Sequence, residues 1–383
     1  MNKDNLKNSS PIQKNTLSVF QIAVMTTISV ASLRTLPPMA EEGRASILMY
    51  IIPAILFLIP TSLVSAEFAT TYKGGVYVWI REAFGNRMGF VAIWLQWIQN
   101  VVWYPVQLAF VAAALAFTIN RGDLSNSGLF TAIVIIVVYW FSTFLAFKGG
   151  NLFAKVSSIG GMIGVLIPGA ILILLGLLWV AQGQPISESY LQSSYIPKVT
   201  GISSLVLIVS NVLSYAGMEM NAVHAGQMEN PKKDFTKAIA LAFILILCVF
   251  IFPTLSIAMA VPADKLGMAN GIMVAFQEFF EKFHIGWMSN IMSGAMFFGA
   301  IASVVTWVAG PSKGLLDAGR TGLLPPILQK TNKNNVQVNI LIFQGIIVTI
   351  LAMIYVLFPD VSDVFIALIG MAAALYVVMY MLM

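Results

Sequence analysis

The chain has 383 residues, of which 58% are hydrophobic and 10% are charged, and its formal net charge is +5. Soluble domains are typically about 45–50% apolar and about 25% charged, so this chain has too few polar side chains to cover a water-facing surface. The composition therefore excludes a soluble protein and predicts an all-α integral membrane protein with several spans.

Apolar runs of roughly 20 residues, enough to cross a bilayer as helices, follow a polar tail over residues 1–16. The runs are continuously apolar, whereas the strands of a membrane barrel alternate. We therefore predict about ten transmembrane helices, near residues 17–39, 46–69, 90–119, 128–147, 154–181, 200–223, 236–261, 287–309, 336–358 and 362–383.

The positions of the basic residues predict the orientation. If the tail over 1–16 is cytoplasmic, most of the 21 Lys and Arg residues fall in cytoplasmic segments, as the positive-inside rule requires. We expect a multi-pass protein of the cell membrane (inner or plasma membrane) with a cytoplasmic N-terminus. Because the basic residues belong to particular loops, the positive net charge does not indicate a nucleic-acid partner.

The first span is interrupted by SVASLRTLPPMAEEG (29–43), which holds an arginine and two consecutive prolines. Pro37 and Pro38 suit the first turn of a helix, where a missing N–H costs nothing. The sequence therefore predicts two half-helices separated by an unwound segment. The residues of this segment are Ala31, Ser32, Leu33, Arg34 and Thr35.

The sixth span is interrupted in the same way by SYAGME (214–219). Gly217 costs about 1 kcal/mol relative to alanine in a helix interior, and Glu219 places a carboxyl group at membrane depth. We predict a second unwound segment here. Its residues are Tyr215, Ala216, Gly217, Met218 and Glu219.

The two interruptions occupy corresponding positions if spans 1–5 (17–181) and spans 6–10 (200–383) are repeats. Because five is an odd number, the second repeat enters the membrane from the opposite side. Paired interruptions of this kind point to the substrate site of a transporter. Unwound helix ends expose N–H groups that attract a carboxylate and carbonyls that attract an ammonium group. The sequence thus predicts a site for a small zwitterion such as an amino acid.

Several motifs carry a family resemblance. They are GGVYVWIREAFG (74–85), SYAGME with ENPKKD (229–234), LSIAMAVP (255–262) and, within 307–325, WVAGPSKG and GPSKGLLDAGRTGLLP. Together they resemble the amino acid–polyamine–organocation (APC) superfamily, and most closely its glutamate/γ-aminobutyrate antiporter branch.

The resemblance implies a 5+5 inverted-repeat bundle with broken helices 1 and 6, and an amino acid permease that works by alternating access. An antiporter with glutamate/γ-aminobutyrate-like substrates is the expected function. Some relatives carry a coupling lysine in span 5, where this chain has Gly164, which favours exchange. The family's spans 11 and 12 are absent, so we expect a shortened copy. An inactive copy, or a channel or sensor with the same fold, remains an alternative.

Each of the two interruptions contains one charged residue, Arg34 in the first and Glu219 in the second. Arg34 costs about 2.5–3.5 kcal/mol to insert at mid-membrane. It is expected to attract an anionic group of the substrate, or else to act as a structural counter-ion or extend outward toward Glu41 and Glu42. Glu219 is expected to gate the site or sense protons, or else to make a fixed structural bond.

The aromatic residues Tyr215 and Trp307 are expected to line the binding site, although packing is an alternative role. Weaker candidates, for gating, are Trp103, Tyr104 and Glu67. No metal-ligand cluster, Ser/His/Asp set or phosphate loop is recognisable, so we expect no metal, no cofactor and no enzymatic activity. The expected partners are an amino acid substrate and the lipid bilayer. The oligomeric state is left open.

Overall fold

The computed structural model describes residues 17–72, 75–148, 159–197, 211–219, 228–358 and 360–383. Within these ranges all regular structure is helical. Eight of the described helices are long and apolar enough to cross a membrane, and a bent pair near the N-terminus forms a ninth candidate. The expected all-α membrane bundle is confirmed. Much of the expected sixth span (200–223) lies outside the described residues.

The helix bounds follow the expected spans closely. In chain order the helices are α1 (Val19–Val30), α2 (Leu36–Glu41), α3 (Ser46–Pro53), α4 (Ile59–Thr71), α5 (Val76–Phe84), α6 (Asn86–Thr118), α7 (Gly128–Phe147), α9 (Ile167–Ala181), α10 (Glu188–Gln192), α12 (Pro231–Ala260), α13 (Gly271–Lys282), α14 (Met288–Gly319), α15 (Val338–Leu357) and α16 (Val361–Leu382).

One boundary was wrong. The eighth span was expected to end at residue 309, before a Gly-Pro pair, but α14 continues through Pro311 to Gly319. Proline removes one hydrogen bond and crowds the preceding turn, which bends or breaks a helix only when neighbouring groups do not compensate. The compensation here comes from another helix, as described below.

The first span breaks where the sequence predicted. A capping box of Ser18 and Gln21 starts α1, which ends at Val30. A short 3-10 turn, η2 (Leu33–Thr35), follows, and the chain then continues in α2 at an angle of 47° to α1. Prolines lie in the first turn of α2, where the missing N–H groups need no partner.

The described part of the sixth span also contains an interruption. Residues 211–214 are helical and residues 215–217 form a turn. Gly217 has a φ of 111°, which only glycine adopts readily. The turn therefore ends the helix at the position that the Gly-containing motif predicted.

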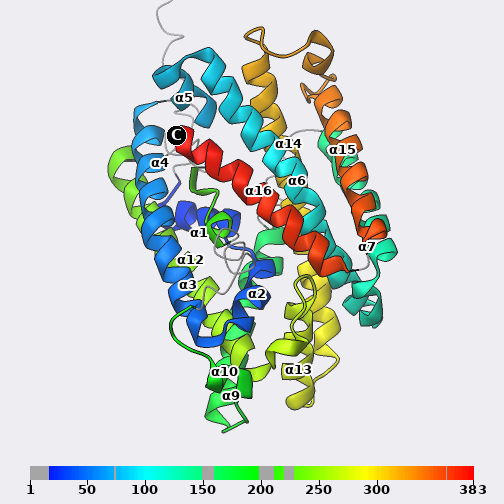
Figure 1. The fold of residues 1–383 in the computed structure, drawn as a ribbon. Helices are drawn as coiled ribbons and strands as arrows, with labels where there is room; N and C mark the ends of the chain where they lie inside the picture. The colour runs from blue at the N-terminus through cyan, green and yellow to red at the C-terminus, as the bar shows by residue number, and fades with distance from the viewer. Residues whose placement is uncertain (1–16, 73–74, 149–158, 198–210, 220–227, 359) are drawn as a thin grey trace, which may run out of the picture.

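Two long helices, α6 and α14, pack against each other in the centre of the bundle, and α16 runs alongside α6 (Figure 1). Among the described elements, α6 packs against α14, α7 against α15 and α4 against α12. In the expected numbering these are spans 3 and 8, 4 and 9, and 2 and 7, so each pair joins helices five spans apart.

The outward faces of the helices carry large apolar side chains. Leu56, Phe141, Leu177, Phe298 and Ile350 are each more than half exposed. Exposed apolar surface on so many helices would be unstable in water and is typical of contact with lipid. This surface accounts for the high apolar content of the sequence.

Glycines permit a very close approach between α14 and the π-helical turn η6 (Met162–Leu166), which precedes α9. A Cβ atom added to Gly164 would overlap the Cα atom of Gly299, and one added to Gly299 would overlap Gly164 in return. The two backbones are therefore in direct contact beside the broken first span.

We expect Gly299→Ala to lower the melting temperature of the detergent-purified protein by several degrees, because overpacking a tight contact costs about 1–3 kcal/mol. Gly75→Ala is the matched control, since nothing lies within 4 Å of a Cβ atom added at Gly75. Equal melting temperatures for the two variants would contradict the contact.

Candidate functional site

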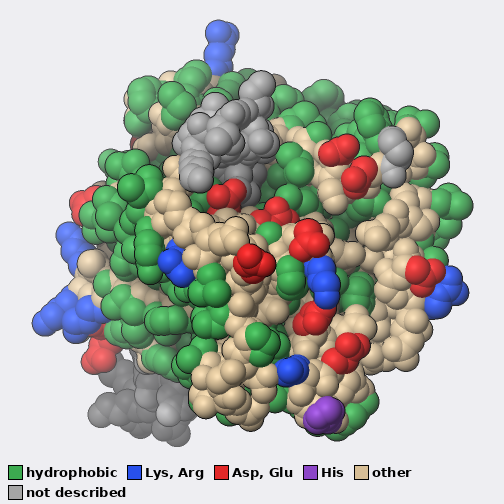
Figure 2. All heavy atoms as spheres, turned by 60° about the horizontal axis from the view of Figure 1, so that its bottom comes forward, with side chains coloured by type: hydrophobic (Ala, Val, Ile, Leu, Met, Phe, Trp, Pro, Cys, Tyr) green, Lys and Arg blue, Asp and Glu red, His purple; other side chains and the backbone are tan. Residues whose placement is uncertain are grey.

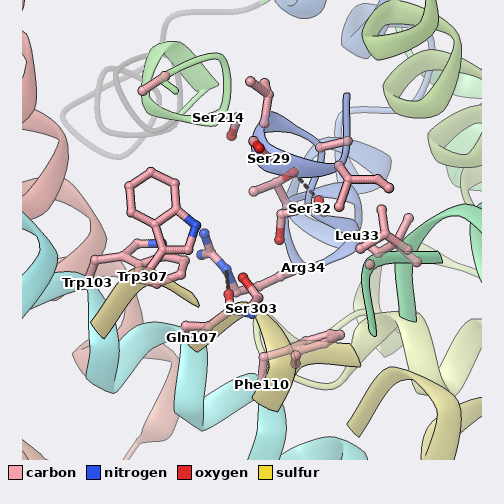
Figure 3. A pocket seen from close by; sticks show the side chains of 18 of the residues that line it. Ser29, Ser32, Leu33, Arg34, Trp103, Gln107, Phe110, Ser214, Ser303 and Trp307 are labelled. Atoms are coloured by element: carbon pink, nitrogen blue, oxygen red, sulfur yellow. Dashed lines mark hydrogen bonds between the residues drawn. The ribbon is translucent and has the colours of Figure 1, made fainter. Parts of the chain in front are cut away.

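A cavity of about 120 Å³ lies at the break of the first span. Residues 28–35 form one wall, and the other walls come from α6, η6, α14, Tyr376 of α16 and the sixth-span residues Leu213, Ser214 and Ala216 (Figure 3). A single water needs roughly 10–15 Å³ by the same kind of measure, so the cavity has room for several waters or a small molecule. The predicted residues Ala31, Ser32, Leu33, Arg34 and Thr35 all line it.

Arg34 is the only charged residue among the described residues that line the cavity. Its side chain is only 4% exposed, and its Nε donates a hydrogen bond to Oε1 of Gln107 at 3.1 Å. Its Cζ lies 5.5 Å from the ring centroid of Phe365, while its Nη1 is buried without a hydrogen-bond partner in the part of the chain that the structure describes. None of the ion pairs among the described residues includes Arg34.

The direction of this side chain excludes one of the expected alternatives. Figure 3 shows the guanidinium lying between Gln107 and the indole rings of Trp103 and Trp307. Arg34 therefore points into the cavity and does not extend outward toward Glu41 and Glu42.

Two tryptophans form the aromatic wall of the cavity. Trp103 of α6 and Trp307 of α14 both line it, with ring centroids 5.9 Å apart. Tyr104 is fully buried outside the cavity, and its hydroxyl donates to the backbone carbonyl of Trp307 at 2.7 Å.

Most of the predicted residues of the sixth span lie away from the cavity. Ala216 lines it, but Tyr215, Gly217, Met218 and Glu219 do not. Tyr215 is fully buried, and its hydroxyl donates to the backbone carbonyl of Tyr50 at 2.9 Å. This tyrosine therefore ties the turn to α3 and does not form part of the cavity wall.

Glu219 is held by α16. Its Oε1 accepts a hydrogen bond from the Tyr376 hydroxyl at 2.6 Å, and its Oε2 accepts one from the Tyr380 hydroxyl at 2.5 Å. The Tyr380 hydroxyl also accepts from the N–H of Gly217 at 3.0 Å. Both oxygens of this buried carboxyl group thus have side-chain partners on α16.

Glu67 does not line the cavity. It is exposed near the end of α4, in a separate hollow that it shares with Lys232 and Thr236 of α12. The structure therefore does not bring Glu67 together with the other predicted residues.

Several cavity residues were missed by sequence reasoning. Gln99, Asn100, Gln107 and Phe110 of α6 and Ser303 of α14 all line the cavity. Residues 99, 100, 103, 107 and 110 are spaced so that they share one face of a helix. Amides recurring at this spacing within an apolar span are the signal that could have identified that face.

Comparison with known proteins shows which protein family the sequence matches. The model of the family described as amino acid permease matches residues 16–383. The chain is 38% identical over 372 residues to an uncharacterised transporter of Legionella pneumophila, covering 97% of this chain and 80% of that protein. It is 30% identical over 372 residues to a glutamate/γ-aminobutyrate antiporter of Lactococcus lactis, covering 96% and 74%. It is 26% identical over 373 residues to a probable agmatine/putrescine antiporter of the same species, covering 96% and 78%.

The bonds around Glu219 predict a stability effect. Tyr380→Phe removes a donor from the buried carboxyl group and an acceptor from the Gly217 N–H. Because an unpaired buried polar group costs about 1–3 kcal/mol, we expect the melting temperature in detergent to fall by several degrees. Tyr72→Phe, a change at an exposed tyrosine, should leave it unchanged. A Tyr380→Phe protein as stable as the wild type would contradict the bonding described.

Proposed function

The chain belongs to the amino acid permease family, and from that premise we propose that it exchanges small amino acids that carry a carboxylate for Arg34, across the cell membrane, by alternating access to the cavity. As a member of this family it is a membrane transporter and not an enzyme. The proposed substrates are glutamate and γ-aminobutyrate-like molecules. One observation carries the proposal: the incompletely bonded guanidinium of Arg34 in the cavity.

The buried and incompletely hydrogen-bonded guanidinium of Arg34 favours the binding of an anion. A charge buried away from water is costly unless it is paired and hydrogen-bonded. Gln107 satisfies Nε and Phe365 faces the cation, but Nη1 has no partner. A carboxylate in the cavity would supply the missing acceptor through a charge-assisted hydrogen bond, and Arg suits carboxylates because its donors form a planar fork.

The broken first span offers a place for the ammonium group. Residues 28–32, at the C-terminal end of α1, line the same cavity as Arg34. The last carbonyls of a helix lack helical donors, and that end of the helix carries partial negative charge. A substrate with its ammonium group at the end of α1 and its acidic group at Arg34 would meet complementary charges at both ends.

The aromatic wall suits a gate. Trp103 and Trp307 stand beside the guanidinium and would cover a bound substrate on that side. Glu67, outside the cavity, is proposed to act only at the separate hollow near the end of α4.

The contacts between spans support two inverted repeats, 17–181 and 200–383. Each of the pairs α6–α14, α7–α15 and α4–α12 joins a helix to its proposed counterpart in the other repeat. Pairings between equivalent helices are expected near a two-fold axis, and rocking of the two halves about such an axis would alternate access to the cavity.

The glycine at residue 164 favours amino acid exchange over transport that is coupled through a lysine at this position. The Cα atoms of Gly164 and Gly299 are in contact, so a longer side chain at residue 164 would displace α14. A lysine could not enter this space without movement of the backbone. We therefore propose that the return step requires a second amino acid.

The charges of one face support the proposed orientation. Figure 2 shows the lower end of the molecule in Figure 1, where acidic side chains are more numerous than basic ones. Positively charged loops are retained in the cytoplasm. We propose that the acidic face is extracellular and that the N-terminus is cytoplasmic.

Counterflow tests the exchange. Proteoliposomes loaded with unlabelled L-glutamate should take up labelled L-glutamate several-fold faster than empty ones. The reason is that an exchanger reopens its cavity to the outside more readily when the cavity holds a substrate than when it is empty. Uptake that is unaffected by loading, or that accompanies an electric current like that of a channel, would reject the exchanger.

Arg34→Met tests the substrate class. We expect the half-saturation concentration for L-glutamate to rise about ten- to hundredfold, because a hydrogen bond to a charged group is worth about 1.5–3 kcal/mol. We expect the melting temperature to hold or rise, since a buried charge is replaced by an apolar side chain of similar length.

Arg44→Met is the matched control for Arg34→Met. Arg44 lies against the rings of Tyr190 and Tyr195, outside the cavity. Unchanged glutamate kinetics in Arg34→Met would remove Arg34 from the binding site. A large loss of stability in that variant would instead assign Arg34 the structural role.

A further inference from the structure

A proline inside α14 leaves one carbonyl without its helical donor. Pro311 lies within the helix and has no N–H. In an α-helix the N–H of residue 311 would bond to the carbonyl of residue 307, so the carbonyl of Trp307 loses this partner. At membrane depth no bulk water replaces the donor, and an unbonded carbonyl there is costly.

The missing donor comes from the neighbouring helix. The hydroxyl of Tyr104 on α6 donates to the backbone carbonyl of Trp307 at 2.7 Å. Tyr104 is completely buried, and its ring centroid lies 5.2 Å from that of Tyr139. The Tyr139 hydroxyl in turn accepts a hydrogen bond from the Gln344 side-chain amide at 2.6 Å. Packing against Tyr139 thus helps to hold the ring of Tyr104 in place.

The bonded residue is also a cavity residue. The indole of Trp307 lines the cavity beside Arg34, and Trp103, adjacent to Tyr104 in sequence, provides the indole that faces it. Consecutive residues of α6 therefore do two things: one forms the cavity wall and the next holds the backbone of the opposite wall.

The following turn of α14 is supported from outside in a similar way. The hydroxyl of Ser312 donates to the carbonyl of Val308 at 2.6 Å, and the side-chain amide of Gln337 donates to that hydroxyl at 2.7 Å. Side chains thus bond two consecutive carbonyls, those of Trp307 and Val308, in the turn before Pro311. This arrangement explains how the WVAGPSKG motif remains helical.

We propose that Tyr104 is a positioning residue, which fixes the Trp307 indole in the cavity by bonding the carbonyl that Pro311 leaves free. The proposal rests on the exchange of amino acids through this cavity. Loss of the hydroxyl would loosen α14 at residues 307–311 and let the indole leave its position against the substrate. Binding would weaken although no atom of Tyr104 lines the cavity.

A double-mutant cycle with Pro311→Ala tests this coupling. Alanine at residue 311 restores the N–H, so the Trp307 carbonyl regains a donor within its own helix. We expect Tyr104→Phe to raise the half-saturation concentration for L-glutamate about three- to tenfold, the effect of one lost buried hydrogen bond. In the Pro311→Ala background the same change should have little effect. An equal effect in both backgrounds would overturn the proposal.

Amide hydrogen exchange gives a readout that needs no substrate. In Tyr104→Phe we expect faster exchange in peptides covering residues 303–316, and we expect Pro311→Ala to reverse it. Tyr139→Phe removes a neighbouring buried hydroxyl that makes no bond to α14 and should leave these peptides unchanged. Unchanged exchange in Tyr104→Phe, or faster exchange with unaltered glutamate kinetics, would also overturn the proposal.

The two proposals fail separately. If the wild-type protein exchanges glutamate and Tyr104→Phe behaves like it in both measurements, only the positioning role is lost. If the wild-type protein shows no counterflow, the proposed function fails, and amide exchange still decides whether Tyr104 holds residue 307.

Discussion

A span inside hydrocarbon must satisfy every backbone hydrogen-bonding group within the protein, because lipid offers no donor or acceptor. This chain interrupts its spans repeatedly, and side chains from other helices supply the missing partners. Pro53 frees the carbonyl of Met49 in α3, and the amide of Asn211 donates to it. The Tyr215 hydroxyl adds a bond to the adjacent carbonyl of Tyr50, which also accepts from the N–H of Ala54. The pairing of Tyr104 with the Trp307 carbonyl is another case of the same requirement.

These bonds hold the interrupted sixth span from two sides. Asn211 and Tyr215 attach it to α3, while α16 binds the N–H of Gly217 and both oxygens of Glu219. A turn that would otherwise expose polar groups to lipid is thereby fixed between two helices. The turn cannot move relative to α3 or α16 unless these hydrogen bonds break. Because Ala216 of the same turn lines the cavity, the position of α16 is linked to that part of the cavity wall.

The two buried charges differ in how completely they are satisfied. The carboxyl group of Glu219 accepts hydrogen bonds at both oxygens and lies outside the cavity lining. The guanidinium of Arg34 faces the cavity with Nη1 unbonded. Since desolvating a charge is costly, the need for a further partner is concentrated at Arg34. The cavity is therefore suited to a ligand that brings a negative charge.

The sequence alone predicted most of the spans, the positions of both interruptions and the presence of an arginine within the first, because apolar run length and most helix-breaking residues act locally. It did not predict that α14 continues through Pro311, which depends on a bond from another helix. It could not assign Tyr215 to α3 or Glu219 to α16, nor identify Gln107 as the partner of Arg34. The tyrosines that bind Glu219 lie 157 and 161 residues further along the chain. Only the packing of the helices decides which distant side chain reaches a freed backbone group or a buried charge, and no local pattern records that choice.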